Sequence, residues 1–453
     1  MKTMVRLLGL LGCLMPLGIH AQSLPDFLES AVMESPAWKR ASIDLRKAEA
    51  KLLEAQAAFD PTWRLSDRGK SVGSDLYYRY QDAQWRIPTL GGVDLYVGGQ
   101  WGNGDWMNPE SSLPASGLVA AGISVPMGPT LWFSERQQNV TRARWHYRMA
   151  KQQWDLTRWD IQRKALNLYL TWSLKVAAQE AYASSWTYLD AQLDMYRQAF
   201  RMGGVSQRDT LDLFAARNTR KSQALQSGWE AQSAFEKMSS FLGHPIDSMR
   251  AWTPMELDAD TWLGLPAPVT RSVEAFPQMA LAAMWAEASQ RDAQFESMQR
   301  WNLPSLGYQF LQKTEDLNPY GGAWKVTWDL PLWNRANRAE RALSRLQLQD
   351  AAIQQDAMKT SLSNEVQQRI QMWGSMKENV VTVTDQTATY ASLLSLERSS
   401  LQLGYSSVFQ VNQREVAYLD ALLKRNQSMA EYITFVGGWW WLTGQEVPWP
   451  AAR

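Results

Sequence analysis

Few residues of this 453-residue chain have the types and spacing that chemistry requires. Histidine occurs three times, as His20, His146 and His244, and no cluster around them has the spacing of metal ligands. No G-x-S-x-G, Walker or dinucleotide-binding motif is present. His146 lies among arginines and a tryptophan, which is typical of a helix surface rather than of a ligand or a base. We therefore expect no catalytic residue, no metal site, no cofactor and no enzymatic activity.

The amino terminus has the layout of a secretory signal peptide. A basic start with Lys2 and Arg6 precedes an apolar stretch over residues 7–19 and a small residue at Ala21. Cleavage after Ala21 would remove Cys13, the only cysteine, and thereby exclude disulfides. The residues before Cys13 also resemble a lipoprotein cleavage box, so its lipidation stays an alternative.

The remaining composition limits how the chain could meet a membrane or a partner. The longest later apolar run, residues 432–442, is about half of the roughly 20 residues that a membrane helix needs. A membrane crossing would therefore require a β-barrel. A net charge of +1 gives no indication of nucleic-acid binding. The 24 tryptophans suit the aromatic girdles of such a barrel, although many will pack between helices.

Proline and glycine recur twice in the same order, which indicates a duplicated unit. The corresponding residues are Pro36, Pro61, Pro126, Gly204 and Gly243 in the first copy and Pro277, Pro304, Pro331, Gly404 and Gly444 in the second. The expected division is a signal peptide (1–21), a first repeat (22–243), a proline-rich linker (244–276), a second repeat (277–444) and a tail (445–453).

Each copy contains the same series of elements. An amphipathic helix leads into an extended region, and a very long helix, a glycine turn and a return helix follow. The expected ranges are 37–59, 62–126, 132–200 and 207–242 in the first copy and 278–302, 304–331, 333–401 and 407–442 in the second. Gly204 and Gly404 stand where a helix end needs a left-handed residue.

The lengths of these helices predict a cylinder. A helix of roughly 69 residues is about 100 Å long and must pack along partners of similar length. The opening and return helices laid end to end nearly equal the long one, so two half-length helices would flank each long helix. The apolar positions expected to form the seams include Trp145, Trp159, Leu166, Leu168 and Trp172.

The extended region of the second copy alternates apolar and polar residues, which predicts strands with two different faces. The partner strand alternates through Leu306, Tyr308 and Phe310. A barrel between lipid and water needs this pattern, although a hairpin packed on helices is the alternative. Four strands per chain cannot close a barrel, so a trimer of twelve strands is expected. The expected lipid-facing positions are Trp324, Val326, Trp328 and Leu330.

The extended region of the first copy is longer. Residues 93–101 and 119–125 alternate in the same way, and residues 102–117 between them are expected to form an external loop. Residues 63–87 either add a further strand pair or extend the first strand. The pattern leaves open whether this repeat supplies two strands or four.

Four segments, in an order that occurs twice, carry a resemblance to a known family. They are ISVPMGPTLW (123–132), FRMGGVSQRDTLD (200–212), TWDLPLWNRANRAERA (327–342) and LQLGYSSVFQVNQREVAYLDA (401–421). With them, the chain after the signal peptide resembles the TolC-like outer membrane efflux protein family. The resemblance implies a mainly α fold with a β-barrel part, in which a trimeric α-helical barrel continues an outer-membrane β-barrel.

The resemblance also implies partners and a role. It implies a homotrimer in the outer membrane of a Gram-negative-type cell, which extends into the periplasm and meets a periplasmic adaptor (membrane fusion) protein and an inner-membrane pump. The chain would be the passive exit duct of a tripartite efflux or type I secretion system. The alternative is a soluble periplasmic coiled-coil scaffold or adaptor that binds partners without conducting. Neither the cargo nor the class of pump is readable from the sequence.

The resemblance places a gate and docking surfaces at the two glycine turns. Segment 204–209 is similar to the first-turn motif of the family, which implies that Asp209 belongs to a polar network closing the periplasmic mouth. The docking positions expected for adaptor and pump are Gly204, Val205, Ser206, Gly404, Tyr405 and Ser406.

The second turn departs from the family pattern. Where the family often carries two aspartates, this chain has Gln410 and Gln413, so three-fold symmetry would form rings of amides rather than carboxylates. An amide ring does not bind cations strongly, and we expect a mouth held by hydrogen bonds and helix packing. An alternative for Gln413 is a solvated helix residue. The expected gate residues are Asp209, Arg208, Gln410 and Gln413.

Overall fold

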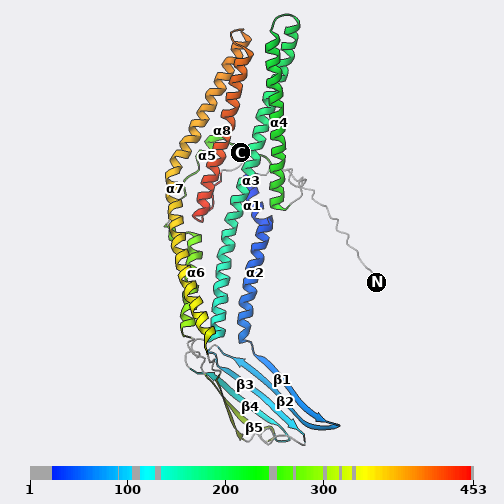
Figure 1. Ribbon diagram of the computed structural model, residues 1–453, viewed down its shortest axis with the longest axis vertical. Helices are drawn as coiled ribbons and strands as arrows, with labels where there is room; N and C mark the ends of the chain where they lie inside the picture. Colours follow the sequence, from blue (N-terminus) through cyan, green and yellow to red (C-terminus); the bar gives the residue numbers. More distant parts are fainter. Residues whose placement is uncertain are drawn as a thin grey trace, which may run out of the picture.

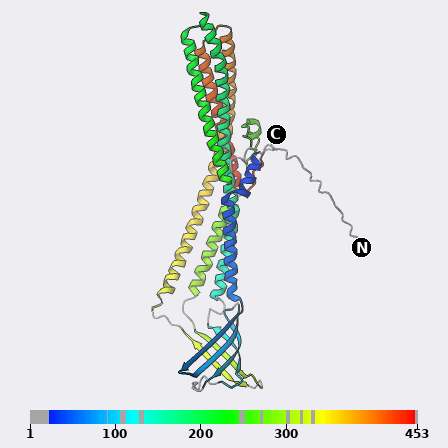
Figure 2. The ribbon, with the colours of Figure 1, turned by 90° about the vertical axis from the view of Figure 1, so that its right-hand side faces the viewer.

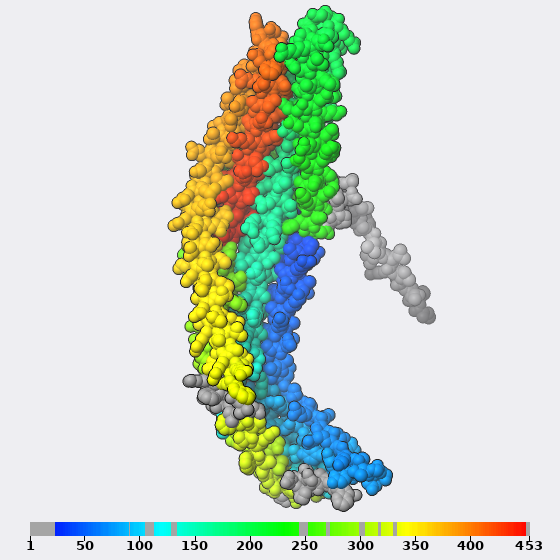
Figure 3. Space-filling model, in the orientation of Figure 1, coloured from blue at the N-terminus to red at the C-terminus, as the bar shows by residue number. Residues whose placement is uncertain are grey.

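The computed structural model shows an elongated, bowed chain with helices along most of its length and strands at one end (Figures 1 and 3). It describes residues 23–449 except 90, 105–112, 128–133, 244–251, 269–271, 299–303, 316–318 and 329–332. The expected signal peptide with Cys13 and the strand position Leu330 therefore lie outside the described residues.

The two longest helices of the rod are α3 (Glu135–Arg201) and α7 (Arg335–Gln402). They contain 67 and 68 residues, so each is about 100 Å long. Neither sequence contains a proline, which would interrupt the helical hydrogen bonds. The expectations of 132–200 and 333–401 therefore agree with these helices to within three residues.

Each long helix is flanked by two shorter helices that follow one another along its length (Figures 1 and 2). The shorter helices are α2 (Pro36–Gln56) and α4 (Gln207–Leu242) beside α3, and α6 (Pro277–Met298) and α8 (Val408–Leu442) beside α7. The turn between α3 and α4 and the turn between α7 and α8 both lie at the end opposite the strands (Figure 1).

The left-handed residues in these turns are Gly203, with φ 76°, and Gly404, with φ 79°. The expectation for Gly404 is confirmed, but that for Gly204 is wrong by one residue. The reason is that α3 ends at Arg201 with Met202 as its cap, so the next position, which needs a left-handed residue, falls on Gly203.

The largest core lies near the middle of the rod. There α1 (Leu24–Glu34) packs on α3, and the ring of Phe27 contacts those of Tyr169 and Trp252. The phenol of Tyr169 donates a hydrogen bond to the carbonyl of Thr253 at 2.5 Å. The described part of segment 244–276, which includes α5 (Ala259–Leu263) and a short 3-10 turn (Val273–Ala275), packs against the helices.

Among the expected seam residues, Leu166 and Trp172 are buried, whereas Trp145, Trp159 and Leu168 are half-buried. His146 is exposed on α3, as expected for a helix-surface residue.

Six strands form one antiparallel sheet in the order β1-β2-β3-β4-β5-β6. They are β1 (Thr62–Val72), β2 (Asp75–Pro88), β3 (Asp94–Asn103), β4 (Leu118–Pro126), β5 (Ser305–Lys313) and β6 (Pro319–Thr327), and a short 3-10 turn (Ala57–Phe59) leads from α2 into β1. The two repeats meet between β4 and β5, where Ile123 pairs with Tyr308.

Of the two alternatives for residues 63–87, the structure shows the additional strand pair, β1 and β2, so the first repeat supplies four strands. The described chain therefore has six strands instead of the four on which the expected trimer of twelve is based. The expected pairing in the second copy is confirmed, since Tyr308 lies opposite Trp324 and Leu306 opposite Val326. Trp328 follows the last residue of β6 and is not part of the strand.

Candidate functional site

The sheet carries most of its charged side chains on one face. Residues paired across neighbouring strands share a face, and the register pairs Arg64 with Gln84 and Arg86 with Tyr96. The charged members of this polar face, traced across the sheet from β1 to β6, include Arg64, Arg68, Asp82, Arg86, Asp94 and Lys325. Side chains from all six strands line one cavity of about 390 Å³ on this face, so the polar face is concave.

The opposite, apolar face is exposed. Trp63 stacks beside Trp85 at 6.0 Å between ring centroids. The register carries this face across the sheet to Phe310 of β5, and Trp324 lies on the same face in the next row. Leu65 and Trp324 are 76% and 75% exposed. An apolar surface of this extent is typical of a lipid or protein contact. The expected positions Trp324 and Val326 both lie on it.

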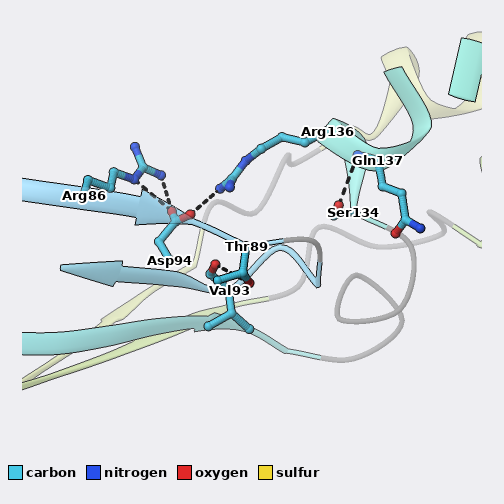
Figure 4. Close-up of polar contacts among 7 residues, drawn as sticks. All are labelled: Arg86, Thr89, Val93, Asp94, Ser134, Arg136 and Gln137. Atoms are coloured by element: carbon cyan, nitrogen blue, oxygen red, sulfur yellow. Dashed lines mark hydrogen bonds and ion pairs between the residues drawn. The ribbon is translucent and has the colours of Figure 1, made fainter. Parts of the chain in front are cut away.

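A carboxylate joins the sheet to the helices. Asp94, at the start of β3, accepts hydrogen bonds from Arg86 of β2 and from Arg136 in the first turn of α3 (Figure 4). The Arg136 guanidinium lies 2.6 Å from Oδ1, and the Asp94 side chain is only 10% exposed. The contact links the end of the sheet nearest the helices to the start of the longest helix of the first repeat.

The local structure on both sides of Asp94 is also fixed by hydrogen bonds. Thr89 donates through its hydroxyl to the carbonyl of Val93 at 2.8 Å, which closes the connection between β2 and β3. Ser134 caps α3 by accepting a bond from the Gln137 N–H at 3.2 Å (Figure 4). Sequence reasoning missed Asp94, although it is the only carboxylate of β3.

The turn between α3 and α4 is the first helical tip, and the turn between α7 and α8 is the second. At the first tip, Asp209 takes part in the N-cap of α4. Its N–H donates to the Ser206 hydroxyl at 3.1 Å, and that hydroxyl donates to the Asp209 carboxylate at 2.7 Å. Arg208 is exposed beside it. Asp209 therefore stiffens the start of the return helix.

At the second tip, the Ser406 hydroxyl contacts both Gln410, at 3.0 Å, and the carboxylate of Glu397 on α7. Gln410 and Gln413 are exposed. None of the polar contacts described within the chain joins Asp209 or Arg208 to Gln410 or Gln413. Each tip thus has its own polar network.

A buried network below the tips, which sequence reasoning missed, joins the two helical hairpins. Glu415 of α8 is 2% exposed and accepts a hydrogen bond from Arg398 of α7 at 3.0 Å. The Arg398 guanidinium lies 4.0 Å from the ring centroid of Tyr188 on α3. The sequence does contain one indication of this site. Glu415 follows Val408 and Val411 at helical spacing on the apolar side of α8, where a carboxylate is unexpected.

Burial raises the pKa of Glu415 above its usual value of 4.5, and Ser185, Arg398 and Arg220 only partly oppose this shift. Between pH 4.5 and the raised pKa, the folded chain holds a proton that the unfolded chain has lost. The contribution of Glu415 to stability is therefore complete below pH 4.5 and is lost as the pH rises through the raised pKa.

The raised pKa of Glu415 predicts how the stability of the natural chain changes with pH relative to Glu415→Gln, because glutamine has no titratable group. The free energy of unfolding of the natural chain, relative to that of Glu415→Gln, should fall as the pH rises from 4.5. Denaturant unfolding of both proteins at a series of pH values measures this difference. A difference that stays level or rises with pH would contradict the assignment.

Both tips expose large apolar side chains to solvent. Met202 is 80% exposed in the first turn, and Leu403 and Tyr405 are 72% and 86% exposed in the second. Side chains of this size at the end of a rod favour contact with another protein.

No group of histidine, cysteine, aspartate or glutamate among the described residues could hold a metal ion. In the same part of the chain, no helix is both long enough and apolar enough to cross a membrane.

Comparison with known proteins identifies the fold. No protein-family model matches the sequence, and no curated protein matches it either. The CmeC outer membrane channel of Campylobacter jejuni is similar in structure, with a TM-score of 0.67 and 11% identity over 93% of this chain and 85% of that one.

Two further channels show the same likeness. The outer membrane protein VceC of Vibrio cholerae has a TM-score of 0.67 and 14% identity, over 93% of this chain and 96% of that one. The open state of the MtrE outer membrane channel of Neisseria gonorrhoeae has a TM-score of 0.64 and 11% identity, over 93% and 89%. The expected fold class, mainly helical with an antiparallel β part as in TolC-like channels, is therefore confirmed.

Proposed function

We propose that this chain is a subunit of an outer-membrane duct that extends into the periplasm and forms the passive exit of a tripartite efflux or type I secretion system. The observation that carries the proposal is the two-faced sheet at one end of the rod, with both hairpin tips at the other. The likeness to outer membrane channels supports it. Energy would come from an inner-membrane pump, reached through a periplasmic adaptor.

The open edges of the sheet support assembly into a trimer. Among the strands that the structure describes, β1 and β6 each pair on one side only, and both are exposed along nearly their whole length. Unpaired edges of this length are normally covered, and pairing β1 of one copy with β6 of the next would be antiparallel. Three copies of six strands would form a barrel of eighteen, instead of the twelve expected from the sequence. Barrels of about 16–18 strands leave an aqueous channel.

Two measurements test the proposed duct. The protein should require detergent for extraction from the envelope fraction and should form discrete conducting steps in planar bilayers. Release by osmotic shock without conductance would instead support the soluble scaffold or adaptor.

Asp209→Ala should raise the single-channel conductance. The substitution removes the carboxylate that accepts the Ser206 hydroxyl at 2.7 Å, which should loosen the start of α4 at the proposed mouth. Recordings in planar bilayers measure the effect, with Asp212→Ala, one turn further along α4, as the control. Unchanged conductance would remove Asp209 from the gate.

Tyr405→Ala should weaken binding of the adaptor or pump without changing stability. Tyr405 is 86% exposed, so its loss should alter the free energy of unfolding by less than about 0.5 kcal/mol. Cross-linking in intact cells measures which inner-membrane proteins are captured, with Leu53→Ala, an exposed leucine on α2, as the control. Equal capture by both variants would exclude the second tip as a docking site.

A further inference from the structure

We infer that the passage lined by the strands selects for anionic solutes over cationic ones. The inference rests on the proposed duct, because it assigns a solute class to the face that would line it. The evidence is the sign of the charges on the concave face of the sheet.

Cations outnumber carboxylates on this face of the described strands. The cations that the register places on it are Arg64, Arg68, Lys70, Arg86, Lys313 and Lys325, and the carboxylates that it places there are Asp82 and Asp94. The charge of Asp94 is already compensated, since it binds Arg86 and also Arg136 of α3. The face therefore keeps a positive excess in each copy.

Three of these cations line one cavity on the sheet. Arg64 of β1, Arg86 of β2 and Lys325 of β6 line the same cavity of about 390 Å³, and Asp94 is the only carboxylate among its lining residues. Arg68 lies further along β1, with its guanidinium 5.3 Å from the ring centroid of Tyr80. A solute that passes along this face would meet cations from both edges of the sheet.

The opposite face shows that the excess belongs to the concave side. Its charged pair, Asp67 and Arg79, forms an ion pair at 2.6 Å and so compensates itself. Because Arg79 lies on the same hairpin as Arg64, Arg68 and Arg86 but faces away from them, it provides a matched control.

Three copies would repeat this excess around the passage. Charges of one sign that line a narrow channel raise the local concentration of counter-ions. At the second helical tip, Gln410 and Gln413 present amides rather than carboxylates, so these positions would not favour cations. The cargo class that fits is therefore small anionic molecules, such as carboxylates and phosphorylated compounds.

Reversal potentials in planar bilayers under a potassium chloride gradient test the inference, with chloride and potassium as the probes. At 0.1 M salt, we expect chloride to permeate at least about twofold more readily than potassium, and at 1 M salt the preference should shrink as the screening length falls from about 10 to about 3 Å. The triple variant Arg64→Gln, Arg68→Gln, Lys325→Gln should lower the ratio toward one, and the single variant Arg68→Glu should also lower it. Arg79→Gln should leave it unchanged.

The possible outcomes separate the two proposals. Absence of any conductance from the natural chain would overturn the duct itself. Conductance that is unselective or prefers potassium would leave the duct standing and overturn the anion preference. An anion preference that the triple variant retains undiminished, or that Arg79→Gln lowers to the same extent, would also overturn the assignment to the concave face.

Discussion

Arg398→Ala should destabilise the folded chain by about 3 kcal/mol, because it leaves the Glu415 carboxylate buried without the cation that is hydrogen-bonded to it. Breaking a buried ion pair usually costs about 3–5 kcal/mol. We expect the lower value, because the Arg398 side chain is 33% exposed and the Glu415 carboxyl group can take up a proton. Denaturant unfolding followed by circular dichroism in detergent measures the change. The variant should also conduct more than the natural chain, since Arg398 joins α7 and α8 to Tyr188 of the other hairpin.

Two further variants make this result decisive. Arg398→Met combined with Glu415→Leu replaces the pair by apolar side chains and should recover most of the lost stability. Arg163→Ala removes a more exposed ion pair with Asp160 and should cost less than about 0.5 kcal/mol. If Arg398→Ala costs no more than Arg163→Ala, the buried network does not hold the hairpins together.

Asp94→Asn should destabilise the folded chain by about 2 kcal/mol, because the amide cannot accept charge-assisted bonds from both Arg86 and Arg136. The loss should loosen the sheet against α3 at the point shown in Figure 4. Thermal unfolding in detergent measures the shift of the midpoint relative to the natural chain.

The control for this prediction lies on the other face of the same sheet. Asp67→Asn breaks the pair with Arg79, whose two side chains are about half exposed, and should cost less than about 1 kcal/mol. Equal shifts for Asp94→Asn and Asp67→Asn would mean that Asp94 does not fix the sheet to the helices.

The helices and the strands of the second repeat could be predicted from the sequence because their signals are local. A stretch of about 69 residues with no proline and with apolar residues at helical spacing predicts a long helix, and the alternation around Trp324 specifies both strand and face. The additional pair β1–β2 was harder to predict, because Asp67 and Arg79 occupy its apolar face and interrupt the alternation.

The functional residues were less predictable because their contacts join distant segments. Arg136 follows Asp94 by 42 residues, and only the folded sheet brings the start of α3 to that carboxylate. Likewise, the apolar spacing on α8 marks Glu415 as unusual. It does not show that Arg398, which binds Glu415, also lies against Tyr188 on α3. The residues expected at the tips were found at the tips, but their role in gating stays a prediction.

Cysteine cross-linking between the sheet edges shows whether three copies enclose a passage. With Cys13→Ser as the background, Leu65→Cys on β1 would be combined in turn with Trp324→Cys and Val326→Cys on β6, and the envelope fraction would be oxidised mildly. We expect a ladder of covalent dimers and trimers that ends at three chains. Monomers alone in every combination, or a ladder that continues beyond three, would contradict it.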